Sequence, residues 1–297
     1  MARLKRSLGE IRMTLPMTEA SLHAVLKETL RRNRVRYGVV YVQISRGVAS
    51  RDHAFPPSPK PTIVVTAKTL DRTVIEARAE NGVKVITLPD ERWTRCDIKS
   101  VNLLPNVLAK QRAREQGAFE AWLVDGDGFV TEGTSSNAWI VDAQGRLRTC
   151  ALSSKILPGV TRATILKLAQ ERQMPVLEQP FTPAEAQSAR EAFLTSAANA
   201  AMPVISIDGK VLGDGKPGPV ARALRAAYFG YIAYFGTYDV SADGGTVTHH
   251  VEGALNPAWV GGDQVRRVRF DGDRLVLSTT VTKGSKIVTH VLTWERA

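Results

Sequence analysis

The sequence predicts a mixed α/β protein that ends in an antiparallel all-β segment. From Val74 to Tyr228, extended runs of strand-forming residues alternate with amphipathic helical patterns. Beyond Phe229 the pattern changes to short alternating strands, which are separated by turn sequences rich in Gly and Asp. The chain of 297 residues is long enough for one large domain or two ordinary ones, each with its own core.

The beginning of the chain predicts two helices and a pair of strands. Apolar residues recur at helical spacing over residues 2–14, and Thr18 is a typical N-cap for a second helix that continues through Leu30. Residues 37–44 and 62–66 alternate and are rich in β-branched side chains, so we expect them to pair as strands. A proline-rich loop connects them.

The central part of the chain alternates between strand and helix patterns. Strands are expected at residues 83–88, 119–124, 137–141, 175–178 and 191–195, and helices at residues 100–116, 160–172, 183–188 and 217–227. A link near residues 69–73 and the change of pattern after Phe229 divide the chain. We therefore predict three parts: residues 1–72, 73–228 and 229–297.

Composition and charge exclude several classes of protein. The chain has no run of about eighteen apolar residues, as a membrane-spanning helix requires, and its start lacks the apolar segment of a secretory signal. We therefore predict no membrane partner. The net charge of +11 comes from arginines and lysines that are scattered over helix faces without interleaved aromatic residues. This distribution favours a solvated surface or a field that attracts anionic ligands, and we predict no nucleic-acid partner.

The cysteine and histidine content predicts neither disulfides nor a metal site. Cys96 and Cys150 are too few for a disulfide framework and lack metal-ligand spacing. This pattern is typical of a cytoplasmic protein whose thiols are reduced. His249 and His250 would point to opposite faces of a strand, so they would not share one ligand set. We predict no metal.

One lysine organises the central part of the chain. Lys99 follows the extended run 83–88 and precedes a helical pattern. Glu132 comes next, directly before a hydroxyl-rich turn, and residues 156–162 form a turn that opens a helix. A pyridoxal phosphate enzyme needs these three features. The lysine amine forms a Schiff base with the cofactor aldehyde, the carboxylate keeps the ring nitrogen protonated, and backbone N–H groups at the helix start bind the phosphate.

Five segments of the chain together resemble a known family. IKSVNLL, VTEGTSSN, ILPGVTR and FLTSAANAAMPV resemble the class IV (fold-type IV) pyridoxal-phosphate aminotransferases. YVQISRGVASRDHAFP is similar to the D-amino-acid aminotransferase branch. The resemblance runs from residue 1 to about residue 228. It implies a fold-type IV α/β architecture and pyridoxal-phosphate-dependent, ping-pong transamination between D-amino acids and 2-oxo acids.

The resemblance also implies a role for individual residues. Lys99 would hold pyridoxal 5′-phosphate and move the proton between the substrate α-carbon and the cofactor C4′. Glu132 would pair with the ring nitrogen, and Leu157 would pack against the ring. The residues expected around the phosphate are Arg3, Val160, Thr161, Ser196 and Ala197.

Arg51 and His53 carry the expected substrate specificity. An arginine with a neighbouring imidazole can hold a substrate α-carboxylate, and the side on which it is held decides which enantiomer presents its α-hydrogen to Lys99. The family's carboxylate trap also uses a tyrosine from its first strands, which this sequence does not contain.

Both ends of the sequence depart from the family pattern. Arg3 and Leu4 resemble the end of the family's His-x-x-Arg-Leu word, so the chain resembles an N-terminally truncated member that lacks the first strands. Residues 229–297 resemble the later half of a lipocalin-like domain, and are too few to close its barrel, so a partial barrel is expected, with Trp259 and Trp294 in its core. A natural fusion, a gene-model artefact and an engineered chimera all fit this pattern.

Several functions stay open at this point. A branched-chain aminotransferase or an aminodeoxychorismate lyase of the same fold is the alternative within the class, although Arg51 and His53 disfavour both. A catalytically inactive fusion with a binding or structural role is the alternative outside the class. Because members of the family dimerise, the resemblance also implies a homodimer.

Overall fold

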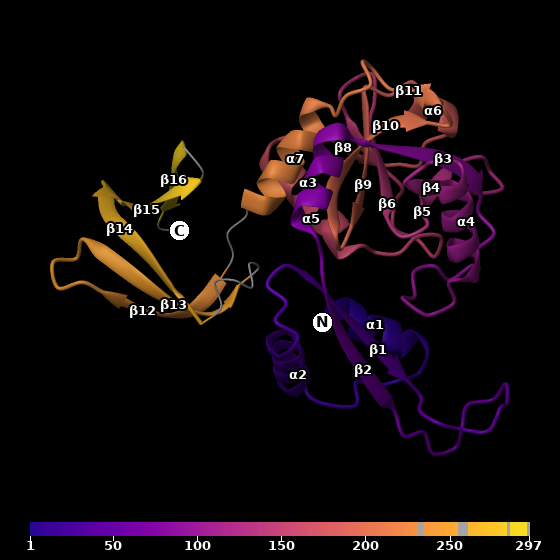
Figure 1. Cartoon of the computed structure of the whole chain (residues 1–297), viewed down its shortest axis with the longest axis horizontal. Helices are drawn as coiled ribbons and strands as arrows, with labels where there is room; N and C mark the ends of the chain where they lie inside the picture. Colours follow the sequence, from indigo (N-terminus) through magenta and orange to yellow (C-terminus); the bar gives the residue numbers. More distant parts are fainter. Residues whose placement is uncertain (231–233, 255–260, 284–285, 296–297) are drawn as a thin grey trace. The chain divides into compact units, whose positions relative to one another are not determined.

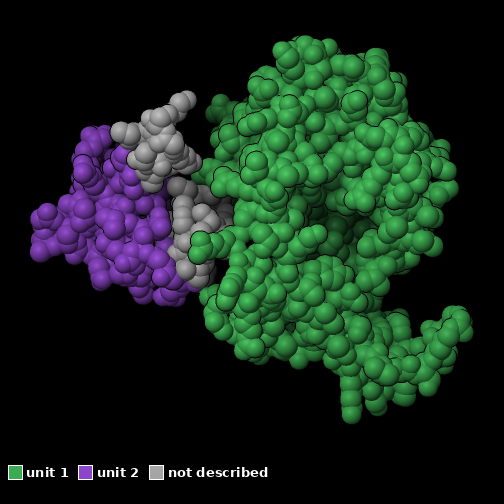
Figure 2. All heavy atoms as spheres, viewed as in Figure 1, with its two compact units in different colours: residues 1–230 green, residues 231–297 purple. Residues whose placement is uncertain are grey.

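A computed structural model describes residues 1–230, 234–254, 261–283 and 286–295. The chain divides into two units, Met1–Gly230 (unit 1) and Tyr231–Ala297 (unit 2), which Figure 2 distinguishes by colour. Unit 1 includes both the first and the second part that the sequence predicts. The division between those parts at residue 72 stays a prediction.

Unit 1 begins with two helices and a strand pair, as expected (Figure 1). These elements are α1 (Ala2–Glu10), α2 (Glu19–Arg32), β1 (Gly38–Ser45) and β2 (Thr62–Thr69). The hydroxyl of Thr18 caps α2 by accepting a hydrogen bond from the Ser21 N–H at 3.1 Å. The two strands pair in antiparallel register from Gly38 opposite Thr69.

A nine-stranded sheet forms the centre of unit 1. Its strands are β3 (Val83–Pro89), β4 (Glu120–Val124), β5 (Val130–Gly133), β6 (Asn137–Val141), β7 (Leu147–Thr149), β8 (Val176–Glu178), β9 (Glu191–Ser196), β10 (Asn199–Ile207) and β11 (Lys210–Val211). The order is β5-β4-β3-β10-β9-β6-β7-β8, with β11 on β10. Strand β3 runs parallel to both β4 and β10, and β9 and β10 form a hairpin.

Helices cover both faces of this sheet (Figure 1). They are α3 (Arg72–Asn81), α4 (Leu104–Glu115), α5 (Val160–Glu171), α6 (Pro183–Gln187) and α7 (Pro219–Gly230). On the face of α5 and α7, the rings of Trp139 and Phe193 stack with centroids 5.5 Å apart. On the face of α3 and α6, Trp122 meets Phe181 edge-on at 5.9 Å. Burying each of these large side chains contributes about 1.5–3 kcal/mol or more, so both faces stabilise the sheet.

Unit 2 is an antiparallel sheet in which each strand pairs with its neighbour in sequence. The strands are β12 (Tyr234–Val240), β13 (Thr246–Ala254), β14 (Asp263–Asp271), β15 (Arg274–Lys283) and β16 (Lys286–Glu295). Gly244 and Gly272 lie in the hairpin turns with φ of 66° and 58°, where a side chain would be strained. The predicted antiparallel all-β segment is confirmed. The expected core position of Trp294 is wrong, because 60% of this residue is exposed, and Trp259 lies outside the described residues.

Candidate active site

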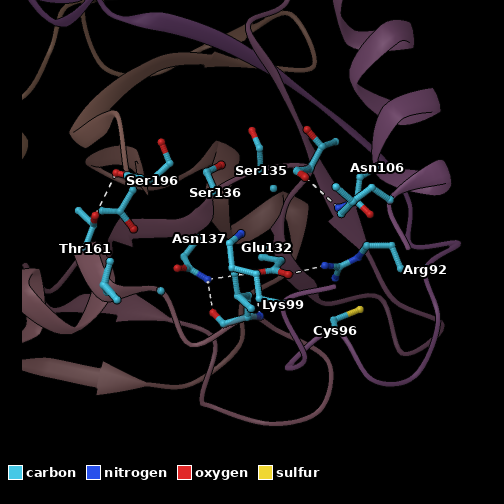
Figure 3. Close-up of a pocket in the computed structure, with 18 of the residues that line it drawn as sticks. Arg92, Cys96, Lys99, Asn106, Glu132, Ser135, Ser136, Asn137, Thr161 and Ser196 are labelled. Carbon is cyan, nitrogen blue, oxygen red and sulfur yellow. Dashed lines mark hydrogen bonds and ion pairs between the residues drawn. The ribbon is translucent and has the colours of Figure 1, made fainter. Parts of the chain in front are cut away.

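A cavity of about 460 Å³ lies in unit 1 and collects most of the residues that the sequence singles out (Figure 3). Its volume falls in the range of small-molecule and cofactor sites. Of the ten expected site residues, the following line the cavity: Arg3, Lys99, Glu132, Leu157, Val160, Thr161, Ser196 and Ala197. Arg51 and His53 are not among the lining residues.

Lys99 lies on the loop between β3 and α4, and buried residues fix this loop on the N-terminal side of the lysine. The neighbouring Asp97 and Ile98 are buried, and the backbone N–H of Lys99 donates to the hydroxyl of Ser7 at 3.1 Å. The pKa of the Lys99 amine lies below its ordinary value, first because the surrounding protein partly desolvates it and second because the charge of Arg3 repels a proton. The carboxylate of Glu132 opposes this shift. A larger fraction of neutral amine favours nucleophilic attack.

Glu132 is a buried carboxylate at the end of β5. It accepts hydrogen bonds from the Asn137 side-chain amide at 3.0 Å and from the Leu157 N–H at 3.1 Å, and it forms an ion pair with Arg92. Burial raises the pKa of Glu132 to about 7, although Arg92 and the Leu157 N–H act in the opposite direction. A carboxyl group with this pKa can hold or release a proton near neutral pH.

Arg92 is a site residue that sequence reasoning missed. Its guanidinium donates to Asp90 through Nε at 2.8 Å and Nη2 at 2.7 Å, and its other terminal nitrogen pairs with Glu132. Only 4% of the arginine side chain is exposed. The spacing of Asp90 and Arg92 could have suggested a local ion pair, but nothing in the sequence connects either residue to Glu132.

Glu120, at the start of β4, is a second residue that sequence reasoning missed. Its carboxylate accepts from the hydroxyls of Ser135 at 2.9 Å, Ser136 at 3.2 Å and Thr134. It also forms an ion pair with Lys110 of α4 at 3.3 Å. These bonds fix the hydroxyl-rich turn that connects Glu132 to Asn137. The sequence around Glu120 carries no motif that could have revealed them.

The start of α5 forms the corner of the cavity that favours anions. The N-cap of this helix is Gly159, which supplies no side-chain acceptor for the first N–H groups. The hydroxyl of Thr161 donates to the Ser196 carbonyl at 3.0 Å, which joins this helix to the end of β9. The guanidinium of Arg3 donates to the Pro158 carbonyl at 3.2 Å and adds a full positive charge to the corner.

These groups fit the cofactor that the sequence predicts. An amine with a lowered pKa, a buried carboxylate and an anion-binding corner surround one cavity of suitable volume (Figure 3). They correspond to the aldehyde, the ring nitrogen and the phosphate of pyridoxal 5′-phosphate.

The two residues expected to select the substrate lie elsewhere in unit 1. Arg51 and His53 are exposed on the loop between β1 and β2. The structure therefore does not bring them to the cavity of their own chain. Their role as a carboxylate trap stays a prediction.

The described ranges of the chain contain neither a membrane-spanning helix nor a metal cluster. Within them, no helix combines the length and apolar character of a membrane span. In the same ranges, histidine, cysteine, aspartate and glutamate side chains do not gather in groups that could hold a metal ion.

Comparison with known proteins gives two matches to family models. The model described as amino-transferase class IV matches residues 1–207, and the model described as lipocalin-like domain matches residues 218–297. A D-alanine aminotransferase of Bacillus licheniformis is 43% identical over 226 residues, which are 76% of this chain and 78% of that protein.

Solved structures of similar fold include branched-chain amino acid aminotransferases. The Escherichia coli structure has a TM-score of 0.71 at 26% identity and covers 77% of this chain and 77% of its own. The structure from the archaeon Thermoproteus uzoniensis, determined with norvaline, has a TM-score of 0.64 at 27% identity and covers 77% of this chain and 77% of its own. These likenesses confirm the predicted fold class of unit 1.

Proposed function

The chain belongs to the class IV aminotransferase family, and on that premise we propose that it transfers amino groups between D-amino acids and 2-oxo acids with pyridoxal 5′-phosphate as cofactor. The reaction follows a ping-pong route, in which the amino donor leaves as a 2-oxo acid before the acceptor binds. The observation that carries this function is the convergence of Lys99, Glu132 and Arg3 on one cavity in a chain related to D-alanine aminotransferases.

We propose that Lys99 is the catalytic residue. When bound, the cofactor takes up the amino group and withdraws electrons from the substrate α-carbon. The Lys99 Nζ holds the cofactor covalently between turnovers and moves the α-proton during turnover. The lowered pKa of this amine supports the role, because a neutral amine acts as both nucleophile and base.

We propose that Glu132 holds the proton at the cofactor ring nitrogen. Its pKa of about 7 supports this role, since the carboxyl group can exchange a proton with a weakly basic nitrogen near neutral pH. Arg92 and Asn137 keep the carboxylate in one orientation. Leu157 would pack against the ring.

We propose that the phosphate is bound by Arg3 and by backbone N–H groups of Val160, Thr161, Ser196 and Ala197. The position of all five in the lining of the cavity supports this assignment. The first N–H groups of α5 and the guanidinium both favour a dianion.

We further propose that the protein is a homodimer in which Arg51 and His53 bind the substrate carboxylate in the cavity of the other copy. Their exposure outside their own cavity supports this arrangement, as does the apolar side chain of Leu103, which lines the cavity and is 49% exposed. Mixing Lys99→Ala with Arg51→Met subunits tests it. If Arg51 acts in the cavity of the other copy, each mixed dimer contains one cavity with both Lys99 and Arg51, and activity returns. If Arg51 acts in the cavity of its own chain, no mixed dimer contains such a cavity, and activity stays absent.

Two further properties are proposals of the same kind. The free thiols of Cys96 and Cys150 support a cytoplasmic location, where thiols stay reduced. The separate matches of residues 1–207 and 218–297 support a fusion of two domains in one polypeptide.

A visible spectrum of the purified protein with pyridoxal 5′-phosphate tests the proposed function. We expect a band in the wild type that is absent from Lys99→Ala and kept in the control Lys155→Ala, whose lysine lies outside the cavity lining. D-alanine should convert this band and L-alanine should not. Conversion by L-leucine alone would favour the branched-chain alternative, and a folded protein without the band would favour the inactive fusion.

A further inference from the structure

Helix α1 reaches the cavity through its first turn, and a network of charges holds it there. Arg6 donates to the Asp97 carbonyl at 2.9 Å and pairs with the Asp97 carboxylate. The hydroxyl of Ser7 accepts the Lys99 N–H at 3.1 Å. The helix is therefore attached to the same loop that carries the proposed catalytic lysine.

The attachment fixes the position of Arg3. Residues four apart lie on one face of a helix, so Arg3 and Ser7 face the Lys99 loop together. Arg3 lines the cavity, donates to the Pro158 carbonyl at 3.2 Å and acts electrostatically on the Lys99 amine. If the helix moved away from the loop, this guanidinium would leave with it.

Asp97 is the centre of the network. Only 6% of this residue is exposed. Its carboxylate accepts from Arg95 through Nε at 2.9 Å and Nη2 at 3.1 Å, and from Arg6 of α1. Arg95 in turn pairs with Glu10 at the other end of α1. Without the Asp97 charge, the guanidinium groups of Arg6 and Arg95 would repel each other across this contact.

We propose that Asp97 is a positioning residue for the active site: it holds α1 against the Lys99 loop and so keeps the guanidinium of Arg3 on the cavity wall. This inference rests on the proposed function, because it assigns Asp97 an effect on the binding of the phosphate group. Asp97 itself does not line the cavity. Its effect therefore passes through Arg3.

Two measurable consequences follow. A charge-assisted hydrogen bond contributes roughly ten- to a hundredfold in affinity, so losing Arg3 from the wall should weaken binding of a phosphate-bearing ligand by about that factor. The positive charge of Arg3 lowers the pKa of Lys99. Its withdrawal should therefore raise the pKa of the free Lys99 amine in the cofactor-free protein, which the pH dependence of the rate of its reaction with pyridoxal measures.

The experiment compares Asp97→Asn, Arg3→Met and the double variant with the full-length wild type. Each is titrated with pyridoxal 5′-phosphate and with pyridoxal, which lacks the phosphate. Asp142→Asn is the control, because Asp142 is also 6% exposed and paired with an arginine, Arg146, but lies outside the cavity lining.

We expect Asp97→Asn to weaken binding of the phosphate-bearing ligand about ten- to a hundredfold and to leave pyridoxal binding within about threefold. The double variant should bind no more weakly than Arg3→Met, because both changes remove the same contact. The pKa of the free Lys99 amine should be higher in both single variants, and the Asp142→Asn control should match the wild type.

Three results would overturn the inference: unchanged binding by Asp97→Asn, equal weakening of both ligands, or additive losses in the double variant. If Asp97→Asn does not fold, Arg6→Met breaks the same attachment from the exposed side and must give the same pattern. A wild type without a Lys99-dependent band would overturn the proposed function itself, which separates that failure from a failure of the inference.

Discussion

Replacing Glu120 by alanine should destabilise unit 1 strongly, because this carboxylate is the shared acceptor of a buried polar network. Glu120 is 1% exposed. It accepts from the hydroxyls of Thr134, Ser135 and Ser136, from one backbone N–H at 3.1 Å, and from Lys110 across 3.3 Å. In the variant, these donors lose their acceptor and a cation is left beside an apolar strand.

The structure sets the size of the expected effect. Removing one partner of a buried ion pair costs about 3–5 kcal/mol. The lower end applies here, because the Lys110 side chain is 24% exposed and has a second acceptor in the Phe119 carbonyl. We therefore expect about 3 kcal/mol for Glu120→Ala and about 1–2 kcal/mol for Glu120→Gln, which keeps one oxygen acceptor.

Thermal melting of the cofactor-free protein measures the difference. Tryptophan fluorescence is a suitable signal because Trp122 and Trp139 are fully buried in unit 1. For a unit of this size, about 3 kcal/mol corresponds to a decrease in Tm of roughly 6–12 °C. Glu28→Gln is the control, since Glu28 pairs with arginines on the exposed side of α2 and should leave Tm unchanged.

Two outcomes would refute this reasoning. A decrease in Tm below about 2 °C for Glu120→Ala would mean that the donors find other acceptors at no cost. Equal decreases for Glu120→Ala and Glu120→Gln would mean that the oxygen which glutamine keeps contributes nothing, so that the lost charge alone would account for the effect.

Three further predictions concern other groups. Burial raises the pKa of Glu132 from 4.5 to about 7, so between these pH values the folded cofactor-free protein binds more protons than the unfolded chain. The free energy of unfolding should therefore fall as pH rises through this window, and Glu132→Gln should remove that slope in pH-dependent melting. Gly159→Ala should weaken pyridoxal 5′-phosphate binding about tenfold in a spectroscopic titration, because the added alanine Cβ would lie 2.2 Å from the Asn137 side-chain oxygen and would force the start of α5 or Asn137 to move. An unchanged affinity would contradict this. By NMR, the pKa of His250 should lie above the usual histidine value, because Asp239 and then Asp263 stabilise its charged form, and the pKa of His249 should lie below that value, because burial disfavours its charged form. The reverse order would be incompatible with the strand pairing described.

The sequence was sufficient for the elements with a strong pattern and for most of the cavity. It predicted α2 and β3 closely, because their periodicity and N-cap signals are local. It missed β5 and β7, which have only four and three residues and so carry too little periodicity. It also missed β10, whose internal Pro203 argues against a central strand; pairing with β3 begins one residue later, at Val204.

The start of α4 shows how a local signal was overlooked. The sequence pattern predicts a helix from residue 100, but the helix begins at Leu104, with Pro105 in its first turn, where proline is favoured. Residues 100–103 continue the loop that carries Lys99. A helix beginning at residue 100 would have placed that proline in the second turn, where it breaks a backbone hydrogen bond.

The missed site residues have a different cause. Arg92 meets Glu132, and Glu120 meets Ser135, only because strands and loops distant in sequence come together in the sheet. A single sequence gives no signal for such a pair. The cavity residues that were predicted lie instead in short sequence motifs that resemble those of a family. Arg51 and His53 show that such a motif identifies a residue without giving its position in the fold.

The pairing order of the strands also bears on how the polypeptide acquires its structure. In unit 2 every strand hydrogen-bonds to the one before or after it in sequence, so each hairpin can close as soon as its residues are available. In unit 1, one edge of β3 has no pairing strand until β10 reaches it, because Val83 pairs with Val204, which is distant in sequence. We therefore expect the sheet of unit 1 to be the slow step of folding, and refolding kinetics followed separately for the two units to differ in rate, with unit 2 the faster.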